Sequence, residues 1–100
     1  MYLLLPFSGV DSENSALVEL INVKSWALAY VDEGKLQTIK FFNTREEIEE
    51  MVDIIVVTND QEYVWPFMEQ HITVLVAHTQ RSLVDIIEAF IFKELHELAS

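Results

Sequence analysis

The three histidines of this 100-residue chain are its best candidates for metal ligands, because the chain has no cysteine. His71 and His78 lie at the two ends of one apolar run, Ile72–Ala77, which is typical of a buried strand. A strand rises ~3.3 Å per residue, so these two imidazoles are expected to lie ~23 Å apart. The helix predicted after His78 runs back along this strand and brings His96 near His71. Two histidines without a third ligand make a poor site, so no metal site is predicted.

The carboxylates and serines form no pattern that is typical of an enzyme. Two-metal phosphoryl chemistry needs carboxylates that converge from strand ends. The first predicted strand, Tyr2–Phe7, contains no acid, and Asp53 opens its strand at the opposite end. No serine lies in a Gly-x-Ser-x-Gly elbow, and the two glycines cannot form a phosphate-binding loop. We therefore predict that the chain is not an enzyme.

The charge of the chain limits its partners. Seventeen acids against six Lys and Arg give a net charge of −11. Such a surface repels nucleic acid and anionic membranes, so neither is a predicted partner. The acidity favours solubility, or attraction to a basic partner or a cation. The first residues lack a basic segment and break at Pro6, which indicates a strand and not a signal peptide. Cytoplasmic location is the expectation.

Apolar runs separated by polar turns predict alternating strands and helices in one domain, residues 1–100. Strands are predicted at Tyr2–Phe7, Trp26–Val31, Leu36–Phe42, Asp53–Thr58 and Ile72–Ala77. Helices are predicted over Leu17–Ile21, from Asn43 or Thr44 to Val52, over Glu62–Gln70, and from Ser82 onward.

Two local patterns are the clearest of the chain. Gly34, between the second and third strands, favours a hairpin, because glycine adopts positive φ readily. Ser82 with Asp85 caps the last helix. Its apolar stripe of period 3.6 is predicted to face the sheet and consists of Leu83, Ile86, Ile87, Phe90, Ile91, Leu95 and Leu98.

This order predicts an α/β fold, a three-layer α/β/α sandwich on a mixed five-stranded sheet. The hairpin forces one antiparallel strand, and the strand–helix alternation of the second half demands parallel neighbours. Trp65 and Phe67 flank Pro66 in the third helix. They either pack in the core or form a patch that binds a partner.

The chain resembles the dinitrogenase iron–molybdenum cofactor biosynthesis family, the NifX-like nitrogenase accessory domains, over nearly its whole length. The resemblance is carried by segments that read as structural elements: Met1–Pro6, Trp26–Leu36, Met51–Val57, Ile72–Ala77 and Ser82–Phe90. It implies a ribonuclease-H-like motif with sheet order 3-2-1-4-5 and strand 2 antiparallel.

The resemblance also implies a function, the carriage of an iron–molybdenum or iron–sulfur cofactor without catalysis. The family has a His-Phe-Gly motif between its first two strands, where this chain has Glu19-Leu20-Ile21. The family's glycine-rich turn after the fourth strand is Asn59–Tyr63 here. Both differences fall where open α/β sheets bind ligands. The sequence therefore predicts an accessory domain that is degenerate at its ligand site and holds no cofactor.

Four polar residues follow the carboxyl ends of the strands and are predicted to hydrogen-bond a small polar ligand: Ser8, Asn59, His78 and Thr79. The alternative function is a protein–protein interaction or homodimerising domain that keeps only the fold. A protein partner or self-association is therefore the predicted kind of interaction.

Overall fold

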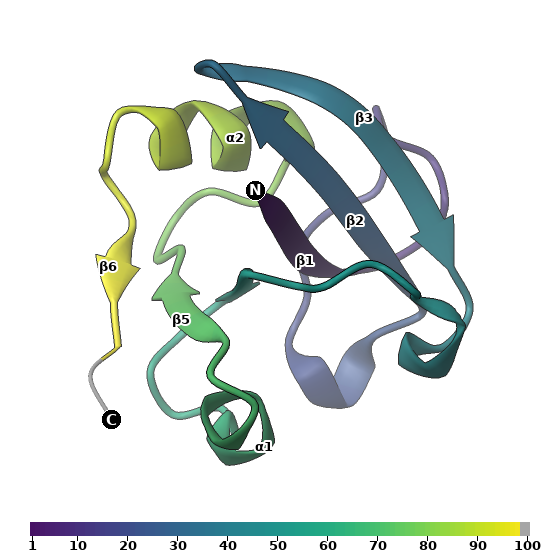
Figure 1. The fold of residues 1–100 in the computed structure, drawn as a ribbon, viewed down its shortest axis with the longest axis vertical. Helices are drawn as coiled ribbons and strands as arrows, with labels where there is room; N and C mark the ends of the chain where they lie inside the picture. The colour runs from purple at the N-terminus through teal and green to yellow at the C-terminus, as the bar shows by residue number, and fades with distance from the viewer. Residues whose placement is uncertain (99–100) are drawn as a thin grey trace.

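A computed structural model describes residues 1–98, so Ala99 and Ser100 of the predicted domain lie outside the described residues. A six-stranded sheet of order β3-β2-β1-β4-β5-β6 forms its centre (Figure 1). The strands are β1 (Tyr2–Phe7), β2 (Ser25–Asp32), β3 (Lys35–Phe42), β4 (Ile54–Val57), β5 (Thr73–Val76) and β6 (His96–Glu97). The helices are α1 (Trp65–Glu69) and α2 (Leu83–Ile91), with 3₁₀ turns η1 (Leu20–Asn22) and η2 (Arg45–Glu47).

The pairing of the first five strands agrees with the predicted order 3-2-1-4-5. β1 pairs antiparallel with β2 and parallel with β4, and β4 pairs parallel with β5. The hairpin between β2 and β3 turns at Glu33 and Gly34, whose φ angles are 53° and 73°. Two residues at positive φ suit the tight turn whose twist matches the flanking strands. The sixth strand, β6, was not predicted.

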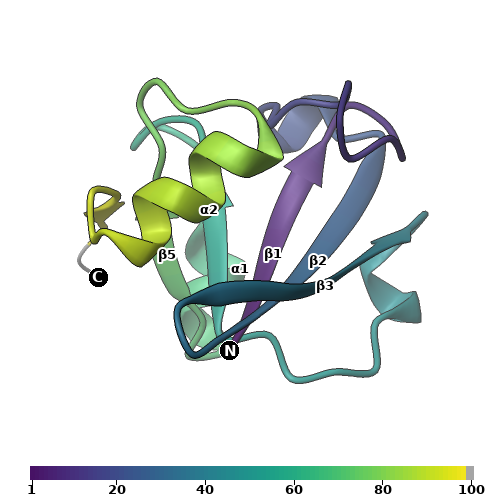
Figure 2. The ribbon, with the colours of Figure 1, turned by 90° about the horizontal axis from the view of Figure 1, so that it is seen from above.

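Each face of the sheet carries its own core cluster. α2 lies over one face of the sheet (Figure 2). The first core cluster, on this face, includes Leu3, Leu5 and Ile86. The second core cluster, on the opposite face, includes Leu4 and Phe67 of α1. Side chains alternate between the faces of a strand, so a continuous apolar run is required where both faces are covered. The layer on the second face is thin, because α1 has only five residues.

The helix predicted over Leu17–Ile21 is wrong. Leu17 instead forms an antiparallel bridge with Phe7, and only the single turn η1 follows. The N–H groups of Ala16 and Val18 are bound by Ser8 Oγ at 3.0 Å and Pro6 O at 2.9 Å. The end of β1 therefore supplies the backbone partners that a helix would have supplied itself.

The second predicted helix is reduced to η2. Its start is the Thr44–Glu47 alternative, since Thr44 N–H donates to Glu47 Oε1 at 2.9 Å. The chain between Phe42 and Ile54 connects β3 to β4, which lie on opposite sides of β2 and β1. It must therefore cross three strand spacings of ~4.8 Å and also run along the length of the strands. A helix rises only ~1.5 Å per residue, whereas extended chain rises ~3.3 Å. The extended connection covers this path with few residues.

The last helix starts as predicted and ends early. Ser82 Oγ accepts the N–H of Asp85 at 3.2 Å. Lys93 then takes a φ of 60°, and Glu94 N–H donates to Ala89 O at 2.8 Å. Together with the bond from Lys93 N–H to Phe90 O, this is the Schellman pattern that ends a helix. Lys93 lies where glycine is usual, so the residue types do not predict that the helix ends here.

Beyond this point the chain reverses and adds β6, antiparallel to β5. Leu95 packs against the first core cluster and Leu98 against the second. Neighbours three apart lie on opposite faces of a strand but on one face of a helix. Leu95 and Leu98 therefore belong to an extended segment and not to the stripe of α2.

No helix within residues 1–98 is long and apolar enough to cross a bilayer.

We expect α2 to tolerate change on its outer face only. Ile86 is 0% exposed in the first core cluster, so Ile86→Ala should lower the free energy of unfolding by ~2–5 kcal/mol through lost burial and a residual cavity. Val84→Ala, two residues away and 69% exposed, should change it by less than ~0.5 kcal/mol. Urea denaturation measures both values. Equal losses in the two variants would show that the helix packs through another face.

Candidate functional site

The four predicted ligand residues lie at one edge of the sheet. β1, β4 and β5 are parallel, and Ser8, Asn59, His78 and Thr79 follow their carboxyl ends. We call this region the carboxyl edge. It is the edge where open α/β sheets bind ligands. The fold therefore brings these residues to the same edge, while their role in binding a ligand stays a prediction.

Two of these four side chains stabilise the local backbone. Ser8 Oγ accepts the N–H of Ala16 at 3.0 Å. Asn59 Oδ1 accepts the N–H of Gln61 at 2.8 Å, which closes the turn after β4. His78 and Thr79 are exposed in the loop after β5. Ser8 is exposed as well, so Asn59 is the one of the four that is partly buried.

Glu62 is the residue of this edge that sequence reasoning missed. Its Oε1 accepts the N–H of Leu20 at 2.6 Å, and its Oε2 accepts both the N–H and the hydroxyl of Thr58 at 2.7 Å. Hydrogen bonds to a carboxylate are roughly twice as strong as those between neutral groups. Glu62 thus joins η1 to the end of β4. Its position as the first residue of a predicted helix gave no sign of this role.

Two shallow pockets flank the Glu62 contact. One of about 440 Å³ is lined by Leu17–Glu19, Asn22, Thr58, Asn59 and Arg81. The other, of about 570 Å³, is lined by Glu19–Ile21, Asn59 and Gln61–Tyr63. Glu19 and Asn59 border both pockets. The acidic residues that line these pockets, Glu19 and Glu62, disfavour the binding of an anionic ligand.

Arg81 is a cation at the carboxyl edge. Its guanidinium donates to Ala77 O and Gln80 O at 2.8 Å and to His78 O at 3.3 Å. The carbonyl oxygen of Arg81 accepts the N–H of Leu17 at 2.7 Å. Arg81 therefore holds the loop after β5 in place, and several of its donors face the backbone and not the pocket.

The structure places His96 differently from the prediction. Because α2 ends at Ile91, His96 lies on β6 opposite Val76, at the carboxyl edge. Its ring centroid is 6.1 Å from that of His78. The prediction that His96 lies near His71, at the other end of β5, is therefore wrong. No group of three His, Asp or Glu side chains that could hold a metal ion is present within residues 1–98.

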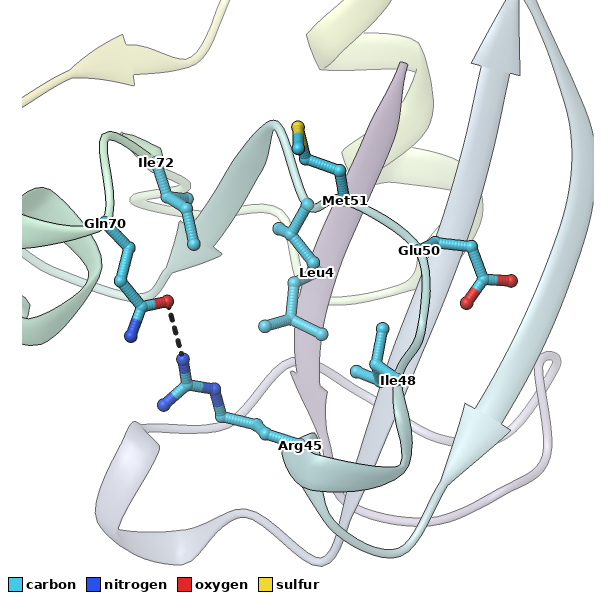
Figure 3. Close-up of a pocket in the computed structure, with 8 residues that line it drawn as sticks. Leu4, Arg45, Ile48, Glu50, Met51, Gln70 and Ile72 are labelled. Atoms are coloured by element: carbon cyan, nitrogen blue, oxygen red, sulfur yellow. Dashed lines mark hydrogen bonds between the residues drawn. The ribbon is translucent and has the colours of Figure 1, made fainter.

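A further pocket of about 230 Å³ opens over the second core cluster (Figure 3). Leu4 and Ile72 line it, and Arg45 reaches across it to Gln70 Oε1 at 3.4 Å. Arg45 also lies 4.3 Å above the Phe67 ring. The arginine is thus engaged by a π face and an amide. This pocket has an apolar floor and no nucleophile.

Glu50, at the rim of this pocket, forms an ion pair with Lys40 at 3.0 Å. The hydrogen bond from Lys40 lowers the pKa of Glu50, and the same bond raises the pKa of Lys40. The side chain of Lys40 is 57% exposed and that of Glu50 is 21% exposed, so solvent screens the pair and it adds little to stability. It joins the chain after η2 to β3.

The two aromatic residues beside Pro66 differ in burial. Phe67 is 4% exposed in the second core cluster, so the core interpretation is confirmed for it. Trp65 is 56% exposed, and Tyr63 nearby is 74% exposed. A partner-binding role for Trp65 stays a prediction.

The donors at the carboxyl edge do not fit an iron–molybdenum or iron–sulfur cofactor. Such clusters are held by thiolates, with imidazole in some sites. The chain has no cysteine, and Glu62, the acid at the centre of the edge, is hydrogen-bonded to the chain itself. No step through such a cofactor follows from this arrangement.

Comparison with known proteins places the chain by fold. No protein-family model matches it, and no curated protein sequence matches it. Solved structures do. A crystal structure of a candidate dinitrogenase from Methanocaldococcus jannaschii superposes with a TM-score of 0.77 at 17% identity, over 100% of this chain and 96% of that one.

Two other structures give the same result. An NMR structure of the same M. jannaschii protein has a TM-score of 0.72 at 19% identity, over 100% of this chain and 94% of the other. The crystal structure of the protein PH0822 has a TM-score of 0.76 at 13% identity, over 100% and 97%. Identities this low show shared fold alone. The chain therefore has a dinitrogenase-like α/β fold.

Proposed function

We propose that this chain is a non-enzymatic accessory domain of the NifX-like kind whose ligand edge is closed by its own Glu62. The observation that carries the proposal is the contact of this carboxylate with the N–H groups of Leu20 and Thr58. Leu20 belongs to Glu19-Leu20-Ile21, the position of the histidine motif in the family that the chain resembles.

Electrostatics support this proposal. Backbone N–H groups at the ends of parallel strands are natural partners for anionic ligands. In this chain the Glu62 carboxylate is bound to two such groups and to the Thr58 hydroxyl. A second anion placed beside it would be repelled by its charge and by that of Glu19. The accessory role then rests on contacts with another protein.

The direct test is the binding of the family's cofactor. After anaerobic incubation with isolated iron–molybdenum cofactor and gel filtration, we expect no stoichiometric molybdenum or iron in the protein fraction, because soft donors are lacking. Metal analysis of the fractions measures this. Co-elution of molybdenum together with iron, abolished in His78→Ala, would contradict the proposal and restore the carrier role.

The structural role of Glu62 gives a second test. Glu62→Ala leaves the N–H groups of Leu20 and Thr58 without their acceptor, and Thr58 is 6% exposed. The free energy of unfolding should fall by ~1–3 kcal/mol in urea denaturation. Glu88→Ala, on the exposed face of α2, makes the same change and should be within ~0.5 kcal/mol of neutral. A Glu62 variant as stable as the Glu88 variant would remove the basis of the proposal.

The free edge of β3 favours a second candidate function, a protein-interaction domain. β3 ends the sheet, and five of its eight residues are exposed: Lys35, Leu36, Gln37, Thr38 and Lys40. An exposed strand edge can pair with an extended segment of another protein. β3 carries two basic residues, Lys35 and Lys40, and no acidic residue, although the chain as a whole is acidic. We infer that the partner segment is acidic.

Selection of peptides tests this second candidate. A random peptide library displayed on phage and selected on the chain should yield acidic sequences of alternating polarity, because their charge complements β3. Their affinity should fall in Lys35→Glu and persist in Lys93→Glu, which changes the net charge equally but lies beyond α2. Neutral or basic selected peptides, or equal losses in the two variants, would rule out the β3 edge.

A further inference from the structure

Two histidines from different elements lie side by side at the carboxyl edge. His96 pairs with Val76 across the antiparallel β5–β6 ladder, and His78 lies two residues beyond Val76. The rings are therefore neighbours where the chain leaves β5, with centroids 6.1 Å apart and planes inclined by 42°. Both residues are exposed. Within residues 1–98, neither imidazole takes part in a hydrogen bond that would hold it away from a ligand.

The separation of the rings suits one shared metal ion. A metal bound to an imidazole nitrogen at ~2.0–2.1 Å lies ~3.2 Å from the ring centroid. Two rings on one ion then have centroids ~4.5 Å apart at a right angle and ~6.4 Å apart when opposed. The observed 6.1 Å falls in this range. A tetrahedral angle at the ion corresponds to centroids ~5.2 Å apart. Exposed side chains change rotamer within nanoseconds, so a rotamer change of either side chain can bring the rings ~1 Å closer.

The surroundings favour a cation. The chain carries a net charge of −11, which attracts cations in general. Arg81 is the nearest basic residue in the loop after β5, and its guanidinium is turned to the carbonyl oxygens of Ala77, His78 and Gln80. Neutral imidazole is a ligand for zinc, nickel and copper ions and a poor one for magnesium, which prefers oxygen.

We propose that His78 and His96 bind one divalent ion of a first-row transition metal, of the zinc, nickel or copper class. Within residues 1–98, no carboxylate and no further histidine joins these two residues as a third protein ligand. Water therefore takes the remaining coordination positions. Such a site is open to an incoming ligand. It goes beyond the accessory function proposed above, because it needs neither Glu62 nor a cluster cofactor.

Titration of the untagged chain with zinc chloride, followed by isothermal calorimetry, tests this site. We expect one ion bound per chain, and no comparable binding of magnesium chloride. His78→Ala and His96→Ala should each weaken zinc binding by at least about tenfold, since each removes one of two donors. Both residues are exposed, so the fold should be kept. Circular dichroism checks this, and His78→Gln and His96→Gln provide variants of more similar size.

The third histidine is the matched control. His71 lies at the other end of β5 and has a φ of 62°, a conformation that asparagine tolerates. His71→Asn removes one imidazole and should leave zinc affinity unchanged. Absence of zinc binding to the chain, zinc affinity that survives both alanine substitutions, or a loss in His71→Asn equal to theirs would each overturn the proposal.

Discussion

The burial of β1 on both faces is the constraint on which the rest of the structure depends. Leu3, Leu5 and Phe7 are 0% exposed on one face, and Leu4 is 1% exposed on the other. Burying each of these side chains contributes ~1.5–3 kcal/mol, provided that both faces are covered. α2 covers one face, while α1 and the chain after η2 cover the other. β2 and β4 pair with β1 on its two sides, so β1 is enclosed in every direction. Polar side chains that could bind a ligand are therefore confined to the strand ends and the outer edges of the sheet.

This constraint explains the use of polar residues at the carboxyl edge. The chain leaves the sheet there after β1, β4 and β5, and the backbone groups of each turn need partners. Ser8, Asn59 and Glu62 accept N–H groups, and Arg81 donates to carbonyl oxygens. The same residue types in the same place could have bound a ligand. In this chain their contacts hold the loops together, and exposed histidines are left beside them.

The sequence predicted the elements whose cause is local. The apolar runs of β1, β4 and β5, the turn at Gly34 and the cap at Ser82 each depend on neighbouring residues, and all are present. The failures are of two kinds. Leu17 pairs with Phe7 ten residues away, and the end of α2 depends on Lys93 at positive φ. Neither leaves a clear local pattern.

The candidate site was predictable only in part for the same reason. The positions of Ser8, Asn59, His78 and Thr79 follow from strand direction, which the alternation of elements supplies. The two contacts that define the edge could not be derived this way. Glu62 reaches Leu20 across 42 residues, and His96 reaches His78 only because β6 replaces the end of a predicted helix.

Hydrogen exchange at two amides tests the central claim most directly, namely that the Glu62 carboxylate closes the carboxyl edge. In the native protein, the N–H groups of Leu20 and Thr58 should exchange slowly, because both donate to this carboxylate. In Glu62→Ala both should exchange much faster, while amides of β1 stay protected. Rapid exchange at Leu20 and Thr58 in the native protein, or protection unchanged in Glu62→Ala, would contradict the account.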